Sequence, residues 1–370
     1  MVRLGDICDI LDNKRVPITA SNRLAGPYPY YGANGVQDYV ADYIFDDELV
    51  LLAEDGGNFG SKDKPIAYRV SGKCWVNNHA HVLKPKEGLD VDYLCYSLMF
   101  YDVTGLVNGA TRQKLTQADM QKMEIPLPPL DEQRKIAAVL DKVSDLIAKR
   151  RHQLDKLDML VKARFVEMFG DFVYDRNRWQ ICEIGDVADT IDPQPSHRTP
   201  PISSDGVPYI GIAECNYKTH FIDFDKARKV GQNVLMEHLE RYSLSEGDFI
   251  IGKIGTIGKP FFIPAKQNYT LSANTVLIKP IKDKIVPQFL FAIFQSEYMG
   301  RIIDAEKKST SQPAFGIQKV RRIEIPMPPM ALQEQFAAFG VQVDKLKLAI
   351  QRSCEELETL KKALMQKYFK

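Results

Sequence analysis

The stretch Ile125-Pro126-Leu127-Pro128-Pro129 decides the architecture of this chain, because it returns as Ile325-Pro326-Met327-Pro328-Pro329 with every residue number larger by 200. Each copy leads into a Glu-Gln pair, Glu132-Gln133 and Glu334-Gln335, so the second copy is two residues longer at this point. A long charged segment with regularly spaced apolar residues follows each pair. Self-similarity at a long fixed period is the mark of a duplicated module. The sequence therefore predicts the order globular unit, long helix, globular unit, long helix.

Length and composition are those of a folded protein with more than one domain. The chain has 370 residues, 45% of them hydrophobic and 26% charged, so we expect two or three domains. No apolar run reaches the length of a membrane span, and because Met1-Val2-Arg3 leads directly into the first unit, we expect no signal peptide. The 6 cysteines lack Cys-x-x-Cys spacing, which is typical of reduced thiols. We therefore expect a cytoplasmic protein that does not enter a membrane.

Charge is unevenly distributed along a chain whose formal net charge is only +1. Residues 1–125 hold 13 Lys and Arg against 17 Asp and Glu, whereas residues 176–325 hold 20 against 17. A protein that binds nucleic acid unaided usually carries an overall basic excess. If this chain binds DNA, a partner must therefore supply much of the phosphate neutralisation.

Each Pro-Pro pair marks the start of a helix, since proline is tolerated before a helix and not inside one. Apolar residues then recur at alternating spacings of four and three, which predicts the seam of a left-handed coiled coil. Arg150 and Ser353 are polar members of these seams, and such residues commonly set the register. The predicted seam residues are Ile136, Leu140, Val143, Ile147, Leu154, Leu157 and Val161 in the first helix and Phe339, Val343, Leu346, Ile350, Leu357, Leu360 and Leu364 in the second.

The two seams match, and neither is buried by its own helix, so we expect them to pack on each other. The first helix delivers the chain to the second unit and the second helix returns, which predicts an antiparallel pair with a pseudo-twofold axis. At about 38 residues, each helix would be roughly 57 Å long. The alternative is two surface helices, each docked on its own domain, but such helices rarely keep a heptad over many turns.

The globular units combine strands and helices. In the first unit, Phe45–Ala53 contains a buried strand, Pro65–Val70 and Cys74–Asn78 are further predicted strands, and Val91–Phe100 is a predicted helix. The second unit repeats this order with good agreement at the strands and poor agreement between them, which suggests one task performed on two targets. The matching segments of the second unit are Asp248–Gly252, Val276–Pro280 and Val286–Phe294.

The loops between these elements carry residues suited to nucleic acid. Asp55–Lys62 corresponds to Gly252–Lys259, and Gly109–Lys114 corresponds to Ser309–Ala314. Glycines let a backbone approach a ligand closely, while Arg, Gln, Asn, Thr and Lys can reach base edges or phosphates. An ordinary turn is the alternative for any single loop, but correspondence across the repeat supports a binding role. The candidate DNA-binding residues are Asn58, Ser61, Lys62, Thr111, Arg112, Gln113, Lys114, Arg198, Thr199, Lys253, Thr256, Lys259 and Gln312.

Motifs for catalysis are missing from the sequence. Gly252–Lys259 lacks the glycine spacing of a phosphate-binding loop, and Pro260 stands where that loop requires Ser or Thr. No Asn/Asp-Pro-Pro-Tyr/Phe motif for amino-methyl transfer occurs. His79 and His81 would share one face of a predicted strand, but no third metal ligand lies nearby in sequence, so we expect a structural or DNA-contacting role and no metal. The chain is thus predicted to recognise a target and not to catalyse a reaction.

Together these features resemble the specificity (S) subunits of type I restriction-modification systems over essentially the whole chain. The resemblance implies an α/β (α+β) fold with two target recognition domains, at residues 1–125 and 173–325. Conserved spacer helices at residues 126–172 and 326–370 would separate them as an antiparallel coiled coil. The residues that carry the resemblance are Ile125–Pro129 with Glu132-Gln133, Phe165–Asp171, Tyr28–Ala33, Ala53–Gly56 and Trp75–His81.

The resemblance also implies a function and partners. Each domain would read one half of a bipartite double-stranded DNA target, and the helices would set the spacer and dock two methyltransferase (M) subunits, through which restriction (R) subunits join. S-adenosylmethionine, ATP and Mg²⁺ are then expected on the partners, and no cofactor on this chain. Two other hypotheses stay open: an adaptor or decoy that acts through its coiled coil without reading DNA, and the recognition half of a single-chain restriction enzyme.

Overall fold

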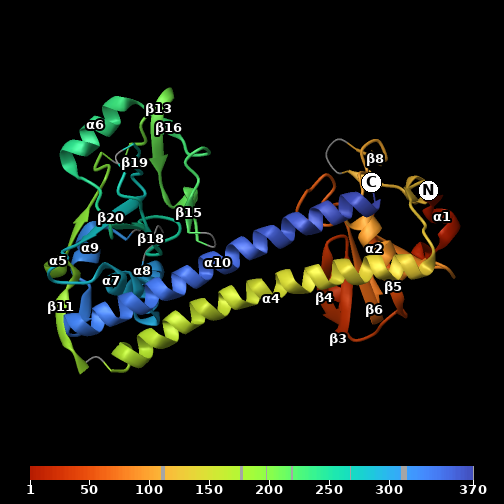
Figure 1. Cartoon of the computed structure of the whole chain (residues 1–370), viewed down its shortest axis with the longest axis horizontal. Coiled ribbons are helices and arrows are strands. Elements are labelled where there is room, and N and C mark those ends of the chain that lie inside the picture. Colours follow the sequence, from red (N-terminus) through yellow and green to blue (C-terminus); the bar gives the residue numbers. More distant parts are fainter. Residues whose placement is uncertain are drawn as a thin grey trace. The chain divides into compact units, whose positions relative to one another are not determined.

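The computed structural model describes residues 1–109, 113–175, 178–196, 198–217, 220–266, 268–309 and 315–369. By their internal packing, these residues form two units. Unit 1 comprises Met1–Arg150 together with Ser353–Lys370, and unit 2 comprises Arg151–Arg352. Each unit therefore contains one globular domain and a part of both long helices (Figure 1). The sequence-based division at residues 125, 172 and 325 stays a prediction.

Unit 1 is built around a central sheet of six strands. The sheet has the order β2-β7-β5-β6-β3-β4, and its pairs are antiparallel except β3 with β6. The elements of unit 1 are β1 (Val2–Arg3), α1 (Leu4–Ile7), β2 (Cys8–Ile10), η1 (Asp12–Lys14), η2 (Ala20–Asn22), β3 (Ala25–Gly32), β4 (Gly35–Val40), β5 (Phe45–Ala53), β6 (Ala67–Val76), β7 (Ala80–Pro85), α2 (Val91–Met99), β8 (Val107–Asn108), β9 (Lys114–Leu115), α3 (Gln117–Gln121), β10 (Glu124–Ile125) and parts of α4 (Leu130–Phe169) and α10 (Met330–Phe369).

The structure confirms the predicted strand β5 and the predicted helix α2. Asp90 caps the start of helix α2. Its carboxylate accepts hydrogen bonds from the backbone N–H groups of Asp92 and Tyr93, both at 3.0 Å. The prediction of two strands at residues 65–70 and 74–78 was wrong, because a single strand, β6, runs through both. Gly72, with a φ of 73°, lets the chain stay paired with β5 across the supposed break.

Unit 2 repeats this design and adds helices α6 and α8. Its central sheet has the order β12-β20-β17-β18, which corresponds to β2-β7-β5-β6 of unit 1. The predicted segments at residues 248–252, 276–280 and 286–294 are β17, β20 and α7. The elements of unit 2, besides its parts of α4 and α10, are β11 (Gln180–Glu183), α5 (Ile184–Val187), β12 (Ala188–Ile191), β13 (Ile202–Ile210), η4 (Ile212–Glu214), β14 (Cys215–Asn216), β15 (Phe221–Ile222), β16 (Lys229–Val230), α6 (Gln232–Arg241), β17 (Phe249–Gly252), β18 (Pro260–Phe262), β19 (Thr270–Leu271), β20 (Thr275–Pro280), α7 (Pro287–Gln295), α8 (Glu297–Ser309), α9 (Ile317–Arg321) and β21 (Glu324–Met327).

The long helices α4 and α10 each begin directly after a Pro-Pro pair, as predicted, and each has 40 residues. A buried glutamine fixes each start. Gln133 accepts a hydrogen bond from the backbone N–H of Asp90 at 2.9 Å, and Gln333 accepts one from the N–H of Val286 at 3.0 Å. The equivalent of Gln133 is thus Gln333, not Gln335. The second copy is therefore not two residues longer, and the expectation that Glu334-Gln335 repeats Glu132-Gln133 was wrong.

This correction predicts different effects for two neighbouring glutamines. Gln333 is 1% exposed and also donates to the carbonyl of Pro328 at 2.8 Å, so Gln333→Ala leaves two backbone groups without their partner. We expect it to lower the free energy of unfolding of unit 2 by about 1–3 kcal/mol. The control Gln335→Ala changes an exposed side chain and should stay within about 0.5 kcal/mol. Denaturation followed by Trp179 fluorescence in a Trp75→Phe background measures both, and equal effects would contradict the assignment.

The two helices pack antiparallel within each unit, as predicted. In unit 1, Val143 and Ile147 in the first half of α4 pack with Cys354 in the second half of α10. In unit 2, the ring of Phe165 near the end of α4 lies 5.5 Å from that of Phe336 near the start of α10, centroid to centroid. An early part of one helix thus meets a late part of the other in both units. No helix among the described residues combines the length and apolarity of a membrane span.

The seam of α10 differs from its prediction. Leu346 and Leu360 are 55% and 47% exposed, so the expectation that they lie in the seam was wrong. In the structure the seam contains Lys347 in place of Leu346 and Cys354 in place of Ser353. Lys347 and Cys354 stand 200 residues after Ile147 and Leu154 of the first seam. The predicted α4 residues are all buried or half-buried, as are Phe339, Val343, Ile350, Leu357 and Leu364 of α10.

A lysine occupies the seam because α4 supplies its counter-ion. The side chain of Lys347 is only 13% exposed, and its amino group pairs with Asp158 at 2.5 Å. The aliphatic part of a lysine can cover apolar surface while its charged end meets a carboxylate. The apolar pattern pointed to Leu346 because the pairing with Asp158 is not visible in either helix alone.

The far end of each long helix completes the core of a unit. In unit 1 the ring of Phe369 lies 5.2 Å from that of Tyr93 on α2, and in unit 2 the ring of Phe169 lies 4.8 Å from that of Phe289 on α7. These aromatic contacts repeat at the same place in the two copies. The helices are therefore integral parts of both cores.

Candidate nucleic-acid interface

The first candidate loop of unit 1 connects β5 to β6. The Asn58 amide donates to the carbonyl of Pro65 at 3.3 Å, and the Ser61 hydroxyl accepts from the backbone N–H of Lys64 at 3.0 Å. These two side chains hold the loop in shape. Lys62, which directly follows Ser61 in this loop, is exposed and could extend toward a ligand.

The second candidate segment lies only partly within the described residues. Thr111 and Arg112, like Gln312 of unit 2, lie outside them. Gln113 is exposed, and Lys114 begins strand β9. The amino group of Lys114 pairs with the carboxylate of Glu54 at 2.9 Å, so part of its charge is neutralised within the unit.

A buried network of charged side chains lies beside both segments. His81 in β7 directs Nδ1 to the Asp12 carboxylate at 2.5 Å and Nε2 to the carbonyl oxygen of Leu115 at 2.9 Å. Arg15 contacts both carboxylates, Glu54 at 2.5 Å and Asp12 at 3.3 Å. The network joins four segments that are distant in sequence. It therefore positions the backbone from which the candidate loops project.

The same network bears on the question of a metal site. Burial opposes the charge of Glu54, but hydrogen bonds from Arg15 and Lys114 outweigh burial and hold its pKa below the usual value. Asp12, Glu54 and His81 bring together three atoms that could ligate a metal. Arg15 and Lys114 already balance the two carboxylates, so the arrangement fits an ion-pair network better than a metal centre.

His79 was expected in the same strand as His81, and this was wrong. Strand β7 begins at Ala80, and His79 lies in the turn before it. The Nδ1 atom of His79 meets the Asp55 carboxylate at 2.7 Å. The two histidines therefore belong to separate contacts, each with its own carboxylate partner.

The matching loop of unit 2 follows β17. Lys253 pairs with Asp192 at 2.9 Å. The amino group of Lys259 lies 3.8 Å from the centroid of the Tyr217 ring, within range of a cation–π contact. Thr256 is exposed between the two lysines. Both lysines are thus held by neighbours within unit 2 and present a defined positive surface.

Arg198 and Thr199 are exposed in the loop before β13. The loop is anchored by Ser196, whose hydroxyl accepts from the Gln194 amide at 2.7 Å. The side-chain amide oxygen of Gln194, Oε1, lies 2.5 Å from Nε2 of His238 on α6. A buried histidine therefore stands behind a candidate loop in unit 2, as His81 does in unit 1. Sequence reasoning did not find His238, because two of its partners, Gln194 and Thr270, lie more than thirty residues away.

Burial of His238 gives unit 2 a pH-dependent stability. Its side chain is 1% exposed, and burial lowers its pKa below the ordinary 6.5, so the folded state favours the neutral ring. Below pH 6.5 the unfolded state binds more protons, and stability falls until the lower folded pKa is passed. We expect unfolding followed by Trp179 fluorescence to show this loss, and His238→Gln to make the slope of stability against pH shallower. His152→Gln, at an exposed site, is the control; an unchanged slope in His238→Gln would refute the assignment.

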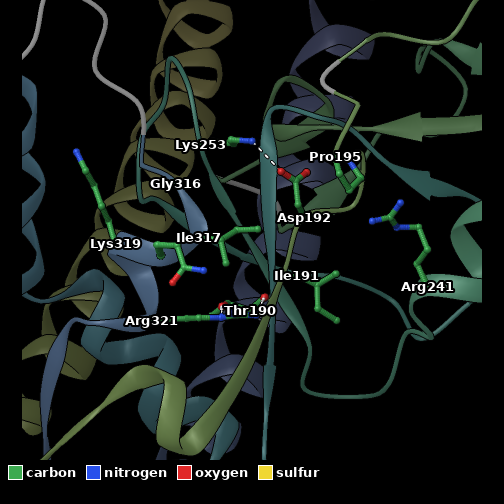
Figure 2. A pocket seen from close by; sticks show the side chains of 11 residues that line it. Thr190, Ile191, Asp192, Pro195, Arg241, Lys253, Gly316, Ile317, Lys319 and Arg321 are labelled. Carbon is green, nitrogen blue, oxygen red and sulfur yellow. Dashed lines mark hydrogen bonds and ion pairs between the residues drawn. The ribbon is translucent and has the colours of Figure 1, made fainter.

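A cavity of about 630 Å³ opens in unit 2 beside Lys253 (Figure 2). Its wall carries the basic side chains Arg241, Lys253, Lys319 and Arg321 and the carboxylate of Asp192. Figure 2 shows Lys253 paired with Asp192, and Arg321 beside Thr190, whose hydroxyl accepts from Nε of Arg321 at 2.8 Å. Sequence reasoning had singled out only Lys253 among these residues.

Two units that repeat one design, each with exposed polar loops and shared long helices, define a duplicated recognition protein. The chain belongs to the family of type I restriction modification DNA specificity domains, which it matches over residues 1–158 and 177–361. Each match includes one globular domain and much of the long helix that follows it. The resemblance noted from the sequence is thereby confirmed, and DNA specificity is the role of this family.

Curated relatives match almost from end to end. A putative type I restriction enzyme specificity subunit of Haemophilus influenzae is 26% identical, over 98% of this chain and 94% of the relative. The type I restriction enzyme MjaVIII specificity subunit of Methanocaldococcus jannaschii is 23% identical, over 99% of this chain and 90% of the relative.

Solved structures show the same fold. The type I restriction-modification S subunit from M. genitalium superposes with a TM-score of 0.62 at 14% identity, over 100% of this chain and 95% of that chain. A chain from a structure of the assembly and conformational transition of a type I restriction-modification system gives 0.56 at 18% identity, over 99% of this chain and 96% of that chain.

Proposed function

We propose that this chain is the non-catalytic subunit that reads a bipartite DNA target for a type I restriction-modification complex, one half-site per unit. The observation that carries the proposal is the contrast between frame and loops. The two units share their central strands, the buried glutamine at each helix start and the aromatic contact at each helix end. The loops at residues 55–62 and 252–259 are held by different contacts, through Asn58 and Ser61 in unit 1 and through Lys253 and Lys259 in unit 2, which suits two readers of different sequences.

The long helices support the second part of the proposal, that they set the spacer and dock two methyltransferase subunits. Within unit 2 they expose apolar side chains away from the seam, among them Met159 at 69%, Leu346 at 55% and Leu348 at 49%. Large exposed apolar groups on both helices favour a protein partner. Restriction subunits would join through the methyltransferases, and S-adenosylmethionine, ATP and Mg²⁺ would be held by these partners. The complex would act on DNA in the cytoplasm.

Binding by the isolated chain separates this proposal from an adaptor that never reads DNA. The net charge is +1, and residues 1–125 carry more acids than bases, so we expect the chain alone to bind target DNA weakly at physiological salt. Addition of the methyltransferase subunit should bring specific binding into the range of about 10⁻⁸ M or tighter. Titration of labelled target and scrambled DNA measures both states. Tight specific binding without the partner would refute the shared-charge argument, and no specific binding with it would favour the adaptor.

A further inference from the structure

The cavity of unit 2 occupies a place that can be matched in unit 1 by its backbone. The carbonyl of Lys253 accepts a hydrogen bond from the N–H of Phe315 at 2.9 Å, and the carbonyl of Glu54 accepts one from the N–H of Leu115 at 2.7 Å. Helices α9 and α3 follow, with five residues each. Lys253 therefore corresponds to Glu54 in the repeated design.

The matched positions are more positive in unit 2. Lys253 and Lys319 stand where unit 1 has Glu54 and Asp119, which reverses the charge, and Arg321 stands where unit 1 has the neutral Gln121. Unit 1 balances its acids internally, since Arg15 and Lys114 bind the carboxylate of Glu54. Unit 2 instead has Arg241 as a further base from α6, an element without a counterpart in unit 1.

The cavity keeps a positive excess after its own ion pairs are counted. Four bases line it, Arg241, Lys253, Lys319 and Arg321. Lys253 pairs with Asp192, and Lys319 pairs with Glu306 on α8. Four positive groups against two carboxylates leave an excess of two positive charges at the cavity.

We propose that this cavity binds a phosphodiester group of the DNA backbone, which gives unit 2 a phosphate anchor that unit 1 lacks. The inference rests on the proposed function. It adds the place in unit 2 at which the protein would hold one part of the DNA backbone. Guanidinium and ammonium groups are the usual partners of phosphate, and Arg241 and Arg321 could each present two N–H donors to it. Phosphate contacts fix orientation and carry no sequence information, so the anchor should add affinity without changing the target.

The test compares two double variants with the same loss of charge. Arg241→Ala with Lys319→Ala removes two bases of the cavity. Lys226→Ala with Lys307→Ala removes two exposed bases elsewhere in unit 2, whose side chains are 86% and 45% exposed. Each protein, assembled with its methyltransferase subunits, is titrated with labelled target DNA over a range of salt concentrations. Thermal melting confirms that both variants fold.

We expect the slope of log affinity against log salt to become shallower by about 1–2 in the cavity variant, since each lost phosphate contact removes about 0.9. The control should keep the slope of the unchanged protein, and the methylated motif should be the same in all three. Equal slopes in both double variants would overturn the proposal, as would a changed motif in the cavity variant.

Inorganic phosphate provides a second arm, because a free phosphate compound shares the chemistry of the DNA backbone. If phosphate raises the melting temperature of the isolated chain through Arg241 and Lys319 while the salt slope for DNA is unaffected, the cavity serves a free ligand and the DNA anchor is refuted. If the unchanged complex shows no target-specific binding, the proposed function itself fails. The two failures are thus distinguishable.

Discussion

Exchange of residues 176–325 for the corresponding unit of a relative is expected to replace one half of the methylated DNA motif completely and to leave the other half unchanged. The reason is that each unit has its own hydrophobic core and its own candidate loops, and among the described residues each sheet is built from strands of a single unit. Each unit should therefore carry the recognition of its half-site with it. Methylome sequencing of a host that expresses the chimera with its methyltransferase measures the result.

The structure shows what such a graft must keep. Phe289 on α7 packs against Phe169 and Phe165 of α4, with ring centroids 4.8 and 5.8 Å apart. Val286, at the start of α7, donates its backbone N–H to Gln333 of α10. A donor unit needs an aromatic residue at the position of Phe289, or the graft loses part of its core and costs about 3–5 kcal/mol.

Two controls make the exchange decisive. A chimera with Phe289→Ala should lose stability and methylation together, whereas the intact chimera should melt close to the parent protein. The reciprocal exchange of residues 1–125 should change the other half-site. A shift of both halves of the motif in either single exchange would contradict independent reading.

The frame of the protein could be predicted because it rests on local rules. Pro128-Pro129 and Pro328-Pro329 define the helix starts, and the buried strands at β5 and β17 follow from apolar runs. The heptad of α4 was found for the same reason. The seam of α10 was misplaced because apolar letters were preferred over Lys347, whose place depends on the carboxylate of Asp158 on the other helix.

The polar networks behind the candidate loops could not be predicted in the same way. Asp12, Glu54 and His81 come from three segments, and only the folded unit brings their ligand atoms within 4.8 Å of one another. His238 and Gln194 are likewise joined only in the folded unit. These contacts depend on tertiary register, which a single sequence does not state.

The cavity of unit 2 is an intermediate case. Its lining cannot be read from the sequence, but the charge reversal from Asp119 to Lys319 and the charge gained from Gln121 to Arg321 can, once the offset of 200 is applied strictly. The incorrect pairing of Glu132-Gln133 with Glu334-Gln335 concealed how regular that offset is. A duplicated chain thus contains its own control, because a charge difference at matched positions points to a difference in task.

Insertion of one heptad into both long helices is expected to lengthen the spacer between the half-sites by about three base pairs while both half-sites are kept. The structure places the insertion after Ile147 in α4 and before Cys354 in α10, because these two residues pack together in unit 1. Seven residues keep the seam in phase and add about 10.5 Å to the helix pair. DNA rises about 3.4 Å per base pair, which gives the expected change.

DNA twist separates the effect of length from that of orientation. One added heptad moves the second half-site by about a third of a helical turn, since a turn holds about 10–10.5 base pairs. Three heptads add about 31.5 Å, or about nine base pairs, and bring the half-sites back near their original facing. If orientation limits the single insertion, the triple insertion should methylate more efficiently than the single one.

The matched control is a heptad inserted into α4 alone. It adds seven residues to α4 that have no matching segment in α10, so the two seams no longer pair along their whole length, and it should abolish methylation at every spacing, with loss of thermal stability. Methylome sequencing of the one-heptad and three-heptad variants then decides the role of the helices. Methylation that persists at the original spacing in both would show that the helices do not set the spacer, because a rod that is longer by about 10 or 30 Å cannot leave the distance it defines unchanged.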